Sequence, residues 1–274
     1  MELFYKQLRY RCQMLRHCIY RQLHRKKAYP KPLLVFGNQK SGTSAIAALL
    51  GIATGKSVLI DLFHRFGARA TPVLYGTTSL QQIWGQASPY LDREIIKEPE
   101  FIFFSDELRA IYADSLRLFI TREPLSNFRS IYNRLGVDGY STHLDKRKRH
   151  EIQKTCPLWL PVVEGPRPEL RGGTILETLA LRWKYAANLY LESQDQFTLV
   201  RYEDFVADRK GTIEHIATRL NLPIKNDITK ASTVQFQPPG KPTNTLRFFG
   251  DKHAKAAFEI CQPEADTLGY CQPT

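Results

Sequence analysis

Residues 32–44, PLLVFGNQKSGTS, are the segment of the sequence that says most about the fold. Residues 33–36 are a short apolar run, typical of a buried parallel strand. A glycine-framed turn at residues 37–42 follows, and Thr43 and Ser44 are favourable residues for the start of a helix. A strand, a loop and a helix N-terminus in this order form an anion-binding site, because backbone N–H groups and the positive end of the helix dipole point toward the anion.

The spacing of Gly37 and Gly42 matches that of an ATP-type phosphate-binding loop, but such a loop has Lys-Ser or Lys-Thr after its second glycine. Here Thr43-Ser44 stands at that place, and Lys40 lies inside the loop. The sequence also shows no strand ending in an aspartate that clearly supplies a second carboxylate for magnesium. A phosphate loop that works without a metal therefore fits better than a nucleotide or small-molecule kinase, which is the alternative enzyme.

The composition fits one α/β domain. The chain has 274 residues, of which 43% are hydrophobic and 24% charged. Its net charge of +12 favours anionic partners, which include a nucleotide, a polyanionic acceptor, nucleic acid and a membrane surface. We expect no specific nucleic-acid partner. The five cysteines form no CxxC pair and are odd in number, which favours a reducing, cytoplasmic location.

Residues 1–29 predict a basic amphipathic helix, with eight lysines and arginines, one glutamate and an apolar stripe. The segment has neither the length of a membrane span nor the core of a signal peptide. Two interpretations stay open. The helix packs its stripe on the domain, or it lies on an anionic membrane and makes the protein membrane-peripheral.

Further strands alternate with helices along the chain, which predicts a central parallel sheet flanked by helices. The later strands are expected at residues 57–60, 94–97, 115–121 and 197–200, and helices at residues 100–112, after Pro124, and at residues 174–193.

A second group of polar residues follows the strand at residues 115–121. Arg122-Glu123-Pro124 ends this strand, and Ser130 lies two turns into the next helix. Because ligands bind at the carboxyl ends of parallel strands, Arg122 and Lys40 are expected to face one crevice. A guanidinium suits bidentate phosphate recognition, although for Arg122 taken alone an Arg–Glu surface pair is the favoured interpretation.

Together, QKSGTS at residues 39–44 and Arg122-Glu123-Pro124 with Ser130 resemble the two phosphate sites of sulfotransferases that use 3′-phosphoadenosine 5′-phosphosulfate (PAPS). Residues 201–205, RYEDF, are similar to a further segment of that family. The resemblance covers roughly residues 32–135 and 174–270. It implies a P-loop-like sulfotransferase architecture, with residues 30–274 as a single domain.

The resemblance also implies roles for particular residues. Lys40 would contact the bridging and sulfuryl oxygens, and Arg122 and Ser130 would hold the 3′-phosphate. Tyr202 would approach the adenine. The residues expected around the 5′-phosphosulfate are Gln39, Lys40, Ser41, Gly42, Thr43 and Ser44. The donor would be PAPS, the product 3′-phosphoadenosine 5′-phosphate (PAP), and no metal would be required.

The sequence departs from the family pattern in two places on the donor side. Many members carry a tryptophan just after the loop that stacks on adenine, whereas Ala45 stands here. Their late Arg-Lys-Gly phosphate clamp is also missing, and Lys241 or Arg247 is a candidate replacement.

The catalytic base is expected near the end of the strand at residues 94–97. Cytosolic members carry Lys-Thr-His there, and this chain has Lys97-Glu98-Pro99. Other branches use a glutamate, so Glu98 is the first candidate, followed by Asp61 and His64. Each of the three has an alternative role as a salt-bridge partner or helix cap.

Residues 136–173 interrupt the family pattern with a basic run at residues 146–150 and a Pro/Gly-rich stretch. A long irregular insertion at the rim of a site is expected to act as a lid or to form solvated surface. The resemblance implies an acceptor hydroxyl or amine, and a glycan, a glycolipid and a small natural product all stay open as the acceptor. A non-enzymatic module binding membranes or polyanions is the rival interpretation, and it leaves Lys40 and Arg122 unexplained.

Overall fold

The computed structural model of the protein describes residues 28–85, 90–234 and 244–272. The predicted helix of residues 1–29, except for its last two residues, lies outside this range. The candidate Lys241 lies outside it as well.

Five parallel strands form one sheet, in the order β2-β3-β1-β4-β5. All five lie where the sequence predicts them, within two residues at either end. Their bounds are Leu33–Gly37 (β1), Val58–Ile60 (β2), Ile95–Lys97 (β3), Arg117–Thr121 (β4) and Thr198–Arg201 (β5). The predicted α/β fold with a central parallel sheet is therefore confirmed.

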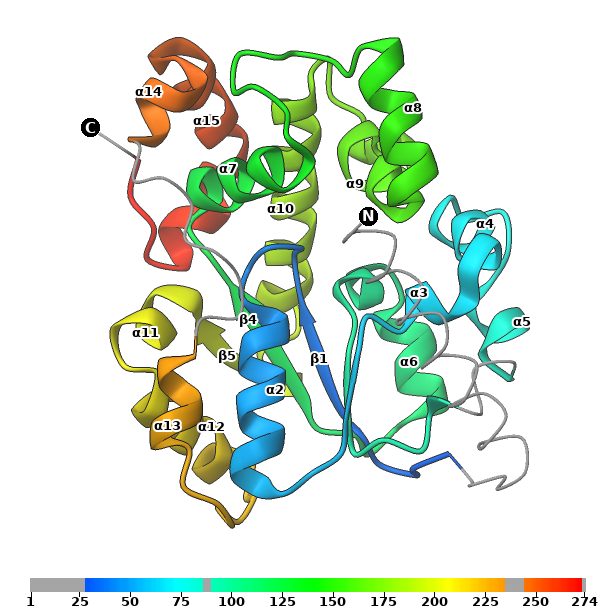
Figure 1. Ribbon diagram of the computed structural model, residues 1–274, viewed down its shortest axis with the longest axis vertical. Helices are drawn as coiled ribbons and strands as arrows, with labels where there is room; N and C mark the ends of the chain where they lie inside the picture. Colours follow the sequence, from blue (N-terminus) through cyan, green and yellow to red (C-terminus); the bar gives the residue numbers. More distant parts are fainter. Residues whose placement is uncertain (1–27, 86–89, 235–243, 273–274) are drawn as a thin grey trace, which may run out of the picture.

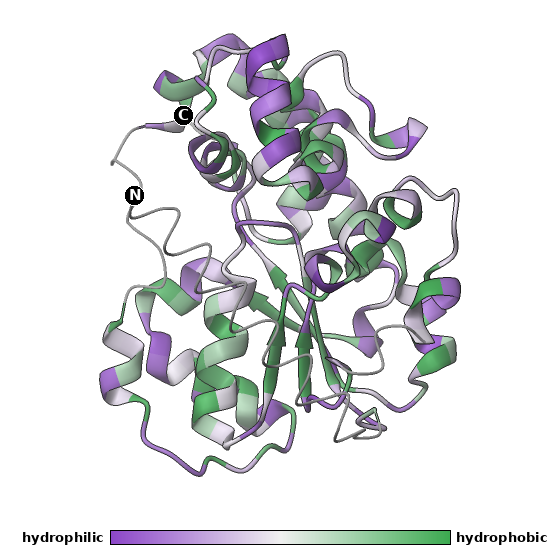
Figure 2. Cartoon of the chain, turned by 45° about the vertical axis from the view of Figure 1, so that its right-hand side comes forward, coloured by the Kyte–Doolittle hydropathy of each residue, from purple (hydrophilic) through white to green (hydrophobic). Residues whose placement is uncertain are grey.

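The strands are apolar because both faces of the sheet are covered (Figures 1 and 2). Leu33 and Val35 of β1 belong to one buried cluster, and Leu34 and Phe36 to another. The first cluster includes residues of α2 (Thr43–Thr54) and α12 (Arg209–Arg219), which cover one face. The second includes residues of the helices over the other face, which are α7 (Pro124–Leu135), α10 (Ile175–Leu191) and α15 (Asp251–Thr267).

The helix expected at residues 100–112 is divided. A 3₁₀ helix, η3 (Pro99–Phe103), comes first, and α6 (Ser105–Ile111) follows. Phe104, between them, has φ −130° and ψ 22°, which is outside the helical region and interrupts the helical path. Its ring and those of its neighbours are buried in the core, which favours this bend over a continuous helix.

Short helices fill the passage after β2, in which the sequence shows no clear periodicity. None spans more than five residues, which is too short for an apolar stripe to recur. They are α3 (Phe63–Phe66), η1 (Gly67–Arg69), α4 (Ala70–Leu74) and α5 (Leu80–Trp84).

The segment of residues 136–173 is helical rather than irregular, which corrects the sequence-based expectation. Its helices are α8 (Lys146–Thr155), η4 (Pro157–Trp159), α9 (Leu160–Glu164) and η5 (Pro168–Leu170). The basic run forms α8 because the Asp145 carboxylate accepts a bond from the Lys148 N–H at 2.6 Å and Ile152 packs into the core. Figure 1 shows α8 and α9 on the side of the molecule toward which the strands run.

The connections place a crevice beside β1. The chain leaves β1 through α2 toward β2 on one side, and it leaves β3 to reach β4 on the other side of β1. Such a switch point leaves room for a ligand at the carboxyl ends of β1 and β4.

The remaining elements are η6 (Gln194–Gln196), α11 (Tyr202–Ala207), α13 (Thr229–Thr233) and α14 (Thr245–Phe249). None of the helices in the described part of the chain has the length and apolar character needed to cross a membrane.

Candidate functional site

A cavity of about 380 Å³ lies at the carboxyl ends of the strands. We divide it into a β4 side, lined by residues that follow β1, β4 and β5, and a β2 side, lined by residues that follow β2 and β3 and by the helical insertion. Most of the predicted site residues line it, namely Gln39, Lys40, Gly42, Thr43, Ser44, Asp61, His64, Glu98, Arg122, Ser130 and Tyr202.

Two glycines allow the loop after β1 to approach its neighbours closely. Gly37 has φ 134°, and a Cβ there would lie 2.3 Å from the carbonyl oxygen of Ile120. Gly42 has φ 83°, and a Cβ there would lie 2.3 Å from the ring of Tyr202. Any side chain at either position would push the loop away from β4 or from Tyr202.

Side chains from outside the loop hold its carbonyl groups. The Lys40 carbonyl accepts a bond from Arg122 Nη1 at 2.7 Å, and the Gln39 carbonyl accepts one from Asn127 Nδ2 at 2.8 Å. Lys40 itself has the left-handed φ of 67°, which is uncommon outside glycine. The first N–H groups of α2 have no partner within the helix, and its first residues line the cavity. The local geometry is therefore suited to an anion.

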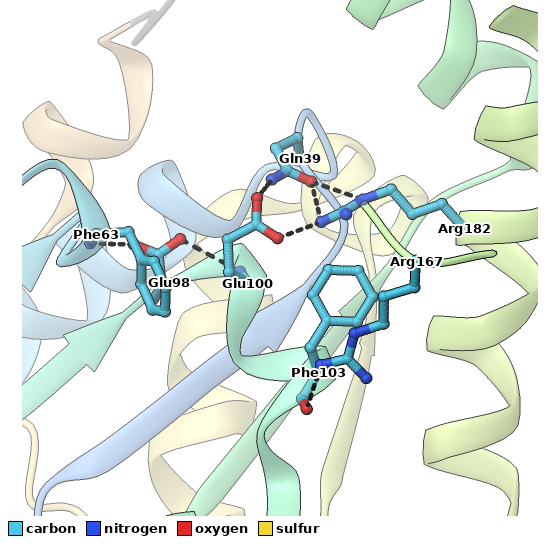
Figure 3. A network of polar contacts seen from close by, with 7 residues as sticks. All are labelled: Gln39, Phe63, Glu98, Glu100, Phe103, Arg167 and Arg182. Carbon is cyan, nitrogen blue, oxygen red and sulfur yellow. Dashed lines mark hydrogen bonds and ion pairs between the residues drawn. The ribbon is translucent and has the colours of Figure 1, made fainter. Parts of the chain in front are cut away.

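Two residues of the loop are engaged by other side chains. Ser41 is buried, and its hydroxyl accepts a bond from Asn127 Nδ2 at 3.0 Å rather than lining the cavity. Gln39 lines the cavity, but its side-chain amide is bound to Glu100 and Arg182 (Figure 3).

Arg122 is fixed at the end of β4 by three contacts. Its guanidinium bonds the Lys40 carbonyl and lies 4.5 Å from the ring centroid of Tyr202, and its own carbonyl accepts a bond from Trp183 Nε1 at 2.9 Å. Arg122 Nε is buried and has no hydrogen-bond partner within the described residues. An unsatisfied buried donor next to the loop is suited to an anionic oxygen.

Several cationic side chains lie near Lys40. Burial, followed by the nearby charges of Arg134, Arg122 and Lys97, lowers the pKa of Lys40 from 10.5 to about 8. Arg134 lies one helical turn beyond Ser130 on α7, and both line the cavity. A bound anion would offset these repulsions.

The β2 side contains the three candidate bases. Asp61 forms an ion pair with the buried ammonium of Lys97, so the predicted alternative role of a salt-bridge partner is seen there. Glu98 accepts bonds from the Phe63 N–H at 2.7 Å and the Glu100 N–H at 3.2 Å, and it caps η3. Burial raises the pKa of Glu98 from 4.5 to about 8, opposed by the charge of Lys97. Burial lowers the pKa of His64, so its imidazole is neutral at pH 7.

Apolar side chains complete the wall of the β2 side. The insertion contributes Leu158, Trp159 and Val162, and Phe63 and Pro99 lie in the same lining. The insertion therefore forms part of the cavity wall and not only solvated surface.

Aromatic residues also line the β4 side near Ala45, where the family tryptophan is missing. Tyr202 and Phe205 follow β5, and Arg209 lies at the start of α12. The Arg209 guanidinium lies 5.9 Å from the ring centroid of Phe205 and donates to the Ser232 carbonyl at 2.9 Å. By contrast, the candidate Arg247 is exposed on α14 and does not belong to the described lining of the cavity.

Several residues that support or line the site do not stand out in the sequence. Asn127, Glu100 and Arg182 are polar residues within buried stretches, and Arg134 and Trp159 line the cavity directly. The available signal was a charged or amide side chain in an otherwise apolar run, as at Glu100 in PEFIFF.

Comparison with known proteins places the fold among solved sulfotransferases. The sulfotransferase STF9 from Mycobacterium avium is 13% identical and superposes with a TM-score of 0.59, over 93% of this chain and 82% of that one. A sulfotransferase from Alicyclobacillus acidocaldarius is also 13% identical, over 89% of this chain and 98% of that one, with a TM-score of 0.49. No protein-family model matches the chain, and no curated protein matches its sequence. At 13% sequence identity, the likeness to STF9 shows a shared fold and nothing beyond it.

Proposed function

We propose that the protein is a sulfotransferase that moves a sulfuryl group from PAPS to a hydroxyl or amine of an acceptor and leaves PAP as product. The single observation that carries this proposal is the buried, unpartnered Nε of Arg122 beside an anion-binding loop that contains Lys40. Solved structures of similar fold are sulfotransferases, which is consistent with the proposal.

On the β4 side, Arg122 and Ser130 would hold the 3′-phosphate, and the N–H groups at the start of α2 would hold the 5′-phosphate. When bound, PAPS supplies an activated sulfuryl group. The Lys40 ammonium and the loop N–H groups would stabilise negative charge that develops on the departing phosphate. Tyr202 and Phe205 would contact the adenine in place of the tryptophan that is absent at Ala45.

On the β2 side, Glu98 would accept the proton of the acceptor, since a base with a pKa of about 8 is close to the working pH of a cell. His64 is the second candidate because its neutral imidazole faces the same cavity. Asp61 is the third, since Lys97 already engages its carboxylate.

The wall of the β2 side favours a small, uncharged natural product over a polyanionic glycan. Five apolar side chains line it, and the charge of Lys97 is balanced by Asp61. A polyanion would instead require cations that face it without such compensation.

Calorimetry on Arg122→Ala tests the donor assignment. A charge-assisted hydrogen bond contributes about 1.5–3 kcal/mol, so the variant should bind PAP roughly tenfold to a hundredfold more weakly. Adenosine 5′-phosphate, which lacks the 3′-phosphate, should bind wild type and variant alike. Arg219→Ala, at the exposed end of α12, serves as the charge-matched control. Equal losses for both nucleotides, or no binding of PAP to the wild type, would contradict the proposal.

A further inference from the structure

Three side chains behind the loop form a closed ring of hydrogen bonds (Figure 3). Gln39 Nε2 donates to Glu100 Oε1 at 2.5 Å, and Gln39 Oε1 accepts from Arg182 Nη2 at 2.7 Å and from Nε at 3.1 Å. The third side is an ion pair, in which Arg182 Nη2 donates to Glu100 Oε2 at 2.9 Å. Each member therefore contacts the other two.

The ring is buried. The side chains of Arg182 and Glu100 are only 3% and 4% exposed. A buried ion pair is often no more stabilising than apolar residues of the same volume, because both charges lose their hydration. Its directional bonds do, however, restrict where the bonded groups can lie.

The ring joins both sides of the cavity to α10. Gln39 directly precedes Lys40, and Glu100 lies two residues after Glu98, whose carboxylate accepts the Glu100 N–H. Arg182 lies on α10, which packs on the face of the sheet that carries Leu34 and Phe36. The backbone of the loop is held in addition by Asn127 and Arg122.

A second arginine offers a matched comparison. The guanidinium groups of Arg182 and Arg167 lie 4.8 Å and 4.7 Å from the ring centroid of Phe103. Arg167 donates to the Phe103 carbonyl at 3.2 Å, and the structure gives it no contact with Gln39 or Glu100. The two residues thus share an aromatic partner but differ in their connection to the loop.

We propose that Gln39, Glu100 and Arg182 are positioning residues that fix the place of Lys40 relative to the segment carrying Glu98. This inference rests on the proposed sulfotransfer, in which the two groups act on the same reacting atoms. Group transfer is sensitive to such placement, since a shift of about 1 Å costs on the order of a hundredfold in rate. Gln39 is thereby assigned to support of the loop, rather than to direct contact with the donor.

The first test uses Gln39→Met, which keeps the size of the side chain, removes its three hydrogen bonds and leaves the Glu100–Arg182 ion pair. We expect kcat to fall about tenfold to a hundredfold, while the Kd of PAP changes by less than about threefold. Arg182→Lys should act in the same direction, because an ammonium cannot reproduce the forked contact of a guanidinium. Arg167→Met is the control, with kcat expected within about twofold of wild type.

The second test does not depend on activity. The pKa of Lys40 is measured by NMR on protein with ¹³C-methylated lysines, and Lys40→Arg identifies the signal. If the ring fixes the loop, the Lys40 pKa rises from about 8 toward 10.5 in Gln39→Met and stays unchanged in Arg167→Met.

An unchanged kcat in Gln39→Met, or a Lys40 pKa equal to that of wild type, overturns the inference. A loss of PAP affinity as large as the loss of kcat also overturns it, because Gln39 is then a donor ligand. If the wild type binds no PAP, the proposed function fails, and the Lys40 pKa still decides whether the ring positions the loop.

Discussion

The β4 side and the β2 side of the cavity are built in different ways. On the β4 side, backbone N–H groups and the cations Lys40, Arg122 and Arg134 face one space, and burial together with the nearby cations lowers the pKa of Lys40. On the β2 side, Lys97 is paired with Asp61, Glu98 takes up a proton readily, and the wall is apolar. The first side carries excess positive charge, and the second is close to neutral.

This difference indicates that the two sides are suited to different ligands. A surplus of fixed positive charge is costly unless an anion neutralises it, so the β4 side is suited to an anionic ligand. The β2 side, with its neutral, apolar wall, is suited to an uncharged ligand that fits its shape.

Lys40→Ala should reduce kcat about a hundredfold to a thousandfold, with a smaller loss of PAP affinity, because the ammonium acts mainly on charge that develops during transfer. Steady-state kinetics and calorimetry with PAP measure the two effects. Lys154→Ala, at the exposed end of α8, is the control. A loss in affinity equal to the loss in kcat would make Lys40 an ordinary ligand of the donor.

Glu98→Gln should reduce kcat about a hundredfold or more, as expected for removal of a general base. In the wild type, kcat should rise with pH through about 8, where Glu98 loses its proton. Glu259→Gln, on the exposed surface of α15, should behave as wild type. The assignment is wrong if Glu98→Gln keeps its activity while His64→Ala loses it. With His64 as the base, the rise of kcat with pH would lie below pH 6.5, because burial lowers the pKa of His64.

Trp159→Ala should raise the KM of a small hydroxy acceptor about tenfold and leave the Kd of PAP unchanged, because a buried aromatic contact contributes about 1.5 kcal/mol. Tyr140→Ala removes an exposed aromatic ring of the same insertion that does not line the cavity. A similar change in both variants would mean that the insertion affects the acceptor only through its overall stability.

PAP binding at pH 8.5 should take up a fraction of a proton, because the Lys40 pKa of about 8 rises when an anion binds beside it. Calorimetry in two buffers with different ionisation enthalpies gives the number of protons. Lys40→Arg stays charged throughout this range and should lower the uptake. If the uptake is the same in this variant, another group on the cavity wall is titrating.

The meeting of Lys40, Arg122 and Ser130 at one cavity could be predicted because each lies just after a strand or on the helix that follows it. Residues 39–44 form one loop, and Arg122 and Ser130 are fixed by one strand and the helix after it. The positions of the strands could also be predicted from the sequence, because a strand that is buried on both faces is an apolar run such as LLVF.

The support of the site could not be predicted in the same way. Gln39, Glu100 and Arg182 meet only because the order β2-β3-β1-β4-β5 places η3 and α10 beside the loop, and no local pattern specifies that order. The insertion was also misjudged, because one cap at Asp145 and one buried Ile152 made a helix from a run of like charges.

The positions of the three tryptophans give the protein its own optical probes. Trp183 donates its indole N–H to the Arg122 carbonyl, Trp159 lines the β2 side, and Trp84 packs in the core against Tyr112. We expect a nucleotide at Arg122 to change the emission of Trp183 and an acceptor to change that of Trp159. Trp84, which does not line the cavity, should provide a constant background. With Trp159 or Trp183 replaced by phenylalanine in turn, the order in which the two ligands bind becomes visible without any label.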